Sequence, residues 1–165
     1  MLQYLIVCPL VFLAGFVDSI AGGGGLISLP AYIIAGVPAH FAIGTNKISS
    51  TLGTSVSTWR YLKNGYLKGK NLIQTAVCAC LTALLGSYIG SSLSLLVSDN
   101  VIKHMMMVVL PIVAFYVLRN KNMGADDGKT KLSSRAVLFV SVLASFVIGM
   151  YDGFYGPGTG TFYLL

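Results

Sequence analysis

The chain has 165 residues, of which 55% are hydrophobic and only 10% are charged, against about 25% charged residues in an ordinary soluble domain. This composition, with a mean hydropathy of +0.79, argues against a soluble globular domain and predicts a membrane protein. The net charge of +6 comes mainly from basic residues in two polar segments, 60–70 and 119–135. That pattern is typical of cytoplasmic loops rather than of a nucleic-acid-binding surface.

A first membrane helix is predicted over residues 2–20, in which Asp18 is the only charged side chain. Four consecutive glycines then break the helix, because each costs roughly 1 kcal/mol relative to alanine in a helix interior. They are Gly22, Gly23, Gly24 and Gly25. A second apolar segment runs from Leu26 to about Ala35. It is too short to cross a bilayer about 30 Å thick, so it is predicted to be a half-helix.

The break beside Asp18 predicts a binding site. An irregular backbone survives at membrane depth only inside protein or beside a wet cavity, because each unpaired N–H or C=O group in hydrocarbon costs several kcal/mol. The amides that open the half-helix would present a positive dipole end to a sulfonate, sulfite or carboxylate group. The structural alternative is that the glycines only allow tight packing, with Asp18 capping the amides that follow it.

Residues 42–60 form a run rich in Ser, Thr and Gly, which suits close packing against neighbouring helices. Asn46 and Lys47 lie near its start, and a charge at membrane depth needs a partner. We expect Lys47 to pair with the substrate, with Asp18 or with Asp152. The alternative is that its side chain snorkels to a lipid headgroup.

Three further helices are predicted along the chain. Residues 71–97 form the clearest spanning helix, and Gly86 and Gly90 lie on one of its faces, where another helix can approach closely. The next helix runs to Leu118, and a last apolar run, 136–151, leads to Asp152. With both basic segments cytoplasmic, an inverted repeat would place the N-terminus outside.

The sequence around Asp18 recurs 134 residues later, around Asp152. In the second copy Gly149, Gly156 and Gly158 align with Gly15, Gly22 and Gly24. Paired segments interrupted by glycine are typical of secondary-transporter binding sites. The predicted fold class is therefore an all-α polytopic transmembrane helical bundle with a broken-helix internal repeat. Its first repeat would cover residues 1–134, and the start of a second repeat would cover 135–165.

Three motifs in the chain resemble those of the sulfite exporter TauE/SafE-like membrane transporters. They are GFVDSIAGGGGLISLP at 15–30, GTNK at 44–47 and YDGFYGPGTGTFY at 151–163. The resemblance covers essentially the whole chain in order. It implies a multi-pass permease of the cell inner membrane that carries small anions, with sulfite, sulfonates and related organic acids as candidates. It also implies a complete second half, so the chain resembles a permease truncated in that half.

The candidate substrate-binding residues are the glycines of both breaks and the polar pair between them. They are Gly22, Gly23, Gly24, Gly25, Asn46, Lys47, Gly156 and Gly158. Asp18 and Asp152 are candidate carriers of a coupling proton, because burial favours the neutral carboxyl group. The expected partners are the lipid bilayer and a small anion, with no metal, cofactor or nucleic acid.

Two other functional classes stay open. The chain would be a non-transporting membrane fragment, or a half-transporter, if it paired with a second copy or a separately encoded second half. A remote alternative is an intramembrane aspartyl protease, because such enzymes use two carboxyl groups that share a proton. The Gly-x-Gly-Asp arrangement of those enzymes is absent, however, since Asp152 precedes its glycines. No enzymatic activity is therefore expected.

Overall fold

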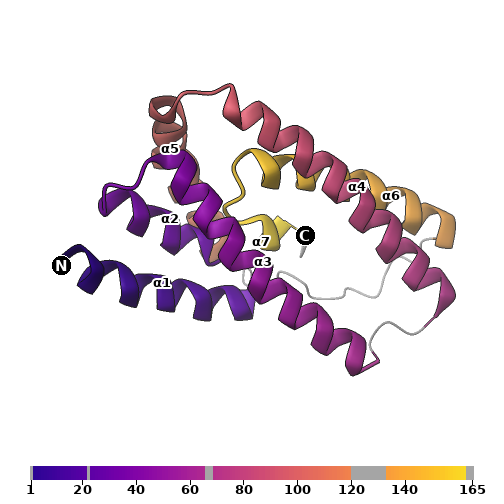
Figure 1. Cartoon of the computed structure of the whole chain (residues 1–165). Helices are drawn as coiled ribbons and strands as arrows, with labels where there is room; N and C mark the ends of the chain where they lie inside the picture. Colours follow the sequence, from indigo (N-terminus) through magenta and orange to yellow (C-terminus); the bar gives the residue numbers. More distant parts are fainter. Residues whose placement is uncertain (1, 22, 66–68, 120–132, 163–165) are drawn as a thin grey trace.

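The computed structural model describes residues 2–21, 23–65, 69–119 and 133–162, and within these ranges it contains helices and short connections but no strand (Figure 1). The helices are α1 (Leu2–Ala21), α2 (Gly25–Ile34), α3 (Ala39–Lys63), α4 (Lys70–Leu95), α5 (Asp99–Arg119), α6 (Ser134–Phe154) and α7 (Thr159–Phe162). The predicted all-α class is confirmed.

Three helices contain stretches that are long and apolar enough to cross a membrane. These are Leu72–Leu95 in α4, Asp99–Tyr116 in α5 and Arg135–Phe154 in α6. Large apolar side chains such as Leu85, Phe115 and Phe139 are exposed on them, as expected where lipid rather than water is the surrounding solvent. The chain is therefore a multi-pass membrane protein.

The chain reverses direction between α1 and α2. Helix α1 ends at Ala21, and α2 begins at Gly25 and runs back beside α1 (Figure 1). A Cβ atom at Gly24 would lie 2.4 Å from the Ala14 carbonyl oxygen, so only glycine allows this close return. Helix α2 has 10 residues, or about 15 Å of helix, which is about half the thickness of an apolar bilayer core.

Helices α4 and α6 are parallel and in very close contact. A Cβ at Gly86 would lie 2.3 Å from the Phe146 carbonyl oxygen, and one at Gly90 would lie 2.0 Å from that of Met150. A Cβ at Gly153 of α6 would likewise lie 2.1 Å from the Ser87 carbonyl oxygen of α4. The close approach predicted on the Gly86 and Gly90 face is confirmed, and α6 is the helix that approaches.

The helices form two groups, and the two helix breaks lie where the groups meet. One group contains α1, α2, α3 and α5, and its core includes Leu29, Ala42 and Ile102. The other group contains α4, α6 and α7. Tyr155, which follows α6, is buried in the core of the first group, so the chain just after α6 connects the two groups.

Two predicted boundaries differ from the structure. Helix α3 continues to Lys63 and α4 begins at Lys70. The segment 60–70, predicted as a loop, therefore begins with the last turn of α3 and ends with the first residue of α4. Basic residues are compatible with helix at the membrane interface, where long side chains reach water. Most of the predicted 119–135 linker lies outside the described residues, and the division at residue 134 stays a prediction.

Candidate functional site

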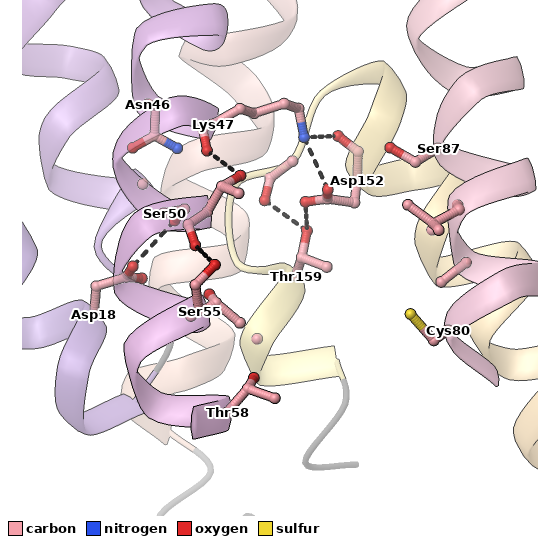
Figure 2. A pocket seen from close by; sticks show the side chains of 18 of the residues that line it. Asp18, Asn46, Lys47, Ser50, Ser55, Thr58, Cys80, Ser87, Asp152 and Thr159 are labelled. Atoms are coloured by element: carbon pink, nitrogen blue, oxygen red, sulfur yellow. Dashed lines mark hydrogen bonds and ion pairs between the residues drawn. The ribbon is translucent and has the colours of Figure 1, made fainter. Parts of the chain in front are cut away.

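A cleft of about 900 Å³, lined by both polar and apolar residues, separates α3 from α4 and α6 (Figure 2). Helix α3 supplies one wall with Asn46, Lys47 and a series of hydroxyl side chains that ends at Thr58. Helix α4 supplies Cys80 and Ser87 on the opposite side. Both helix breaks border this cleft, through Asp18 and Gly25 from the first and Asp152, Gly156 and Gly158 from the second.

Asp18 is held by neutral hydrogen-bond donors. The Gly24 N–H donates to Asp18 Oδ1 at 2.9 Å, and the Ser50 hydroxyl donates to Oδ2 at 3.1 Å. A Cβ at Gly24 would lie 2.6 Å from the Asp18 Cβ, so this carboxylate is packed tightly against the break. Among the amides that the structure describes after Asp18, the one that donates to it is the Gly24 N–H, within the break.

Asp152 is instead held by a cation. Lys47 donates from Nζ to Asp152 Oδ2 at 2.9 Å and to the Asp152 main-chain oxygen. The Thr159 hydroxyl donates to Oδ1 at 2.8 Å. The Lys47 side chain is 29% exposed and that of Asp152 is 38% exposed, and both line the cleft. Of the partners considered for Lys47, the structure has Asp152 rather than Asp18 or a lipid headgroup.

Asn46 lies where the two breaks meet. The buried Ser28 hydroxyl donates to Asn46 Oδ1 at 2.5 Å. The Asn46 Nδ2 group, the other arm of the same amide, therefore does not face Ser28. A Cβ at Gly25 would lie 3.2 Å from Asn46 Nδ2 and 3.5 Å from the Cα of Pro157. The first break therefore lies almost in contact with the second, with the Asn46 amide beside them.

The predicted site residues fall into three sets. Those that line the cleft are Asp18, Gly25, Asn46, Lys47, Asp152, Gly156 and Gly158. Gly23 and Gly24 are buried behind it, and Gly22 lies outside the described residues. Within the described ranges, no group of three or more His, Cys, Asp or Glu side chains could hold a metal.

Sequence reasoning missed the side chains that hold the two carboxylates, Ser50 and Thr159. Helical spacing could have indicated Ser50, because residues 47, 50, 51 and 54 lie three or four apart and share one face of α3. All four line the cleft. Thr159 carries a weaker signal, since it follows the last glycine of the second break.

A second ion pair was also missed. The ring Nδ1 of His40 contacts the Asp99 carboxylate, and Nε2 lies 3.1 Å from the Ser94 main-chain oxygen. These contacts join the start of α3 to the end of α4 and the start of α5. No sequence pattern pairs residues that are 59 positions apart.

A model of the family described as "Sulfite exporter TauE/SafE" matches residues 7–165. The chain is 39% identical over 155 residues to "Probable membrane transporter protein ORF9" of Sinorhizobium sp, covering 93% of this chain and 56% of that protein. It is 33% identical over 150 residues to a "Probable membrane transporter protein" of Haemophilus influenzae, covering 91% and 56%. It is 32% identical over 153 residues to "Probable membrane transporter protein YfcA" of Escherichia coli, covering 93% and 54%.

The chain thus spans about half the length of the curated relatives it matches. No solved structure matches it significantly. The family model covers nearly the whole chain, and three helices in the described ranges can cross a membrane. On these grounds the chain belongs to the sulfite exporter TauE/SafE family, whose members are membrane transporters rather than enzymes.

Proposed function

We propose that the chain provides the substrate site of a secondary transporter for small anions, with sulfite, sulfonates and related organic acids as candidate substrates. One observation carries this proposal: two helix breaks, each with an aspartate, border one cleft that is also lined by Lys47. Broken helices at membrane depth are the usual place for substrate and ion sites in secondary transporters. Because the family consists of transporters, the protease alternative has lost its support.

The two breaks support the proposed internal repeat. Each aspartate lies within four residues of a helix end and accepts a hydrogen bond from a residue within the following break or just after it. The donor is the Gly24 N–H for Asp18 and the Thr159 hydroxyl for Asp152. We propose that residues 1–134 and 135–165 are the first repeat and the start of the second. Asp18 and Asp152 are then the two carboxylates available to carry a coupling proton.

The chemistry of the cleft favours an anionic substrate. Lys47 is the one cation among the described residues that line it, and Asn46 adds an amide whose Nδ2 group is a hydrogen-bond donor. The glycines at the breaks carry no side chain that would block a ligand from the main chain. Oxyanions accept several hydrogen bonds at once, so sulfite and sulfonate groups match these donors.

The inner membrane is the proposed location, and the whole transporter is proposed to include a further half. The chain spans about half the length of its relatives, and every residue of α3 from Thr51 to Lys63 is exposed. A helix face so rich in hydroxyl groups is poorly suited to lipid. This favours a half-transporter that pairs with a second half or a second copy, which is the second candidate function.

Flux into proteoliposomes tests the proposal. The chain alone is compared with the chain extended by the C-terminal half of the Sinorhizobium relative, using sulfite, taurine-type sulfonates and thiosulfate. Flux of one of these anions through the extended protein is expected, and flux through the chain alone would mean that no added half is needed. If the extended protein is folded and carries none of them, the anion-transport proposal is wrong.

A further inference from the structure

We propose that Lys47 exchanges partners during transport. An anion that enters the cleft replaces the Asp152 carboxylate on the Lys47 ammonium group, and Asp152 takes up one proton as it is displaced. This inference rests on the proposed anion-transport function and goes further, because it gives the two aspartates different roles. Asp152 carries the proton, and Asp18 holds the first helix break in place.

The Lys47–Asp152 pair can be reached from the cleft. Both side chains line it, and they are 29% and 38% exposed. Two of the hydrogen bonds that the ammonium group can donate go to Asp152. One of these goes to the carboxylate and one to the main-chain oxygen, so an anion that takes the donor now on Oδ2 would displace the Asp152 carboxylate.

The charge balance of the cleft favours exchange over simple addition. Asp18, Lys47 and Asp152 are the charged side chains among the described residues that line it, so with both carboxylates ionised it carries one net negative charge. A monovalent anion added without a proton would double that charge within one cleft, where like charges repel each other. A proton on Asp152 leaves the net charge of the occupied cleft equal to that of the empty cleft.

The hydrogen bonds distinguish the two aspartates. When the anion takes Lys47, Asp152 Oδ2 loses its donor and becomes free to accept the proton, while Thr159 continues to donate to Oδ1. At Asp18 both oxygens keep their hydrogen bonds during the exchange, from the Gly24 N–H and the Ser50 hydroxyl, and neither of these donors contacts Lys47 Nζ.

Other titratable groups near Asp152 are poorly placed to accept the proton. Cys80 of α4 faces the same cleft (Figure 2), but a neutral thiol has no vacant site for a proton. The hydroxyl of Tyr151, the preceding residue, donates to the Pro157 main-chain oxygen at 2.9 Å. Asp152 is thus the group beside Lys47 that exchange leaves with a vacant acceptor.

Proton uptake on anion binding tests this inference. The probe is methanesulfonate, because its charge does not change between about pH 5.5 and pH 8. Binding to the purified chain is followed by calorimetry, and released or absorbed protons are followed with a pH dye in weak buffer. We expect uptake of about one proton per anion, and an affinity that falls by up to about tenfold per pH unit.

Three variants locate the proton. Asp152→Asn should still bind methanesulfonate, but without proton uptake and with an affinity that no longer depends on pH. Asp99→Asn is the matched control, because it removes a carboxylate that pairs with a base outside the cleft, and it should keep the proton uptake. Lys47→Met should lose binding at every pH.

The possible outcomes separate this inference from the proposed function. Binding by the wild-type chain without proton uptake would overturn the exchange, as would uptake that persists in Asp152→Asn. Loss of uptake in Asp18→Asn with full uptake in Asp152→Asn would assign the proton to Asp18. If the folded chain binds neither methanesulfonate nor sulfite at any pH, the anion site itself is wrong. The wild-type measurement is decisive even if Asp152→Asn does not fold.

Discussion

At the scale of single residues, the ion pair in the cleft depends on space left by a glycine. A Cβ at Gly156 would lie 2.9 Å from Lys47 Nζ and 3.3 Å from Asp152 Oδ1. The backbone of Gly156 has a φ of +90°, which L-residues with a side chain adopt only at a cost of about 1–2 kcal/mol. Lys47 and Asp152 can approach each other here because the turn has no side chain.

We therefore expect Gly156→Ala to impair both stability and anion binding. The added methyl group strains the turn and displaces Lys47 from Asp152, so the affinity for methanesulfonate and its pH dependence should both change. Calorimetry measures the binding, and thermal unfolding in detergent measures the stability.

Gly36→Ala provides the matched control for this substitution. Gly36 has a φ of +83°, close to that of Gly156, and a Cβ there would have no other atom within 4 Å. Its cost in stability should be similar, at about 1–2 kcal/mol, while anion binding stays as in the wild type. Equal binding by the two variants would show that Gly156 matters only for its backbone conformation.

At the scale of helices, the contact between α4 and α6 depends on small residues. We expect Gly90→Ala to lower the free energy of unfolding by roughly 1–3 kcal/mol, because its Cβ would lie 2.0 Å from the Met150 carbonyl oxygen and force the helices apart. Unfolding in mixed dodecylmaltoside and SDS micelles measures the change.

The control for the helix contact is Gly53→Ala on α3, where a Cβ would have nothing within 4 Å. That variant should be more stable than the wild type by roughly 0.5–1 kcal/mol, because alanine is the better helix former. If both substitutions have the same effect, helix propensity rather than packing decides the result.

The His40 ion pair predicts a pH-dependent link between helices. His40 lies outside the three candidate spans, and its pKa is raised by the Ser94 carbonyl and by Asp99. A base whose pKa is raised by folding stabilises the fold while it is protonated. Its contribution is thus complete below about pH 6.5, the ordinary histidine value, and is lost as pH rises through the higher folded value.

The thermal midpoint in detergent should consequently fall between about pH 6 and pH 9, and His40→Gln should reduce this fall. His104→Gln is the control, because the His104 ring is hydrogen-bonded to the Asn100 main-chain oxygen of its own helix, and it should behave like the wild type. A midpoint that falls equally in His40→Gln would assign the pH dependence to other groups.

At the scale of the whole molecule, local patterns predicted the helices well because their causes are local. The glycines after Ala21 stop α1 wherever it packs, and apolar length alone indicates that α4, α5 and α6 can cross a membrane. The partner of Lys47 could not be predicted, because that depends on which helix break packs against α3. The contact between His40 and Asp99 depends on how the turn at Gly36 brings the start of α3 to α5.

Orientation also belongs to the whole molecule. Helices α4 and α6 are parallel, since Ala83 contacts Gly149 and Ser87 contacts Gly153, so they begin at the same end of the molecule, and a basic segment of the sequence precedes each of them. The positive-inside rule places that end in the cytoplasm. Helix α1 begins at the opposite end of the molecule (Figure 1), and the N-terminus should therefore be outside.

Cysteine labelling checks this orientation. In a chain with Cys8, Cys78 and Cys80 replaced by serine, Gln3→Cys should react with a membrane-impermeant maleimide on intact spheroplasts. Lys63→Cys, at the basic end of α3, should react only after the membrane is opened. The reverse pattern would place the basic segments outside. It would also turn the cleft that contains Asp18 and Asp152 around relative to the two faces of the membrane.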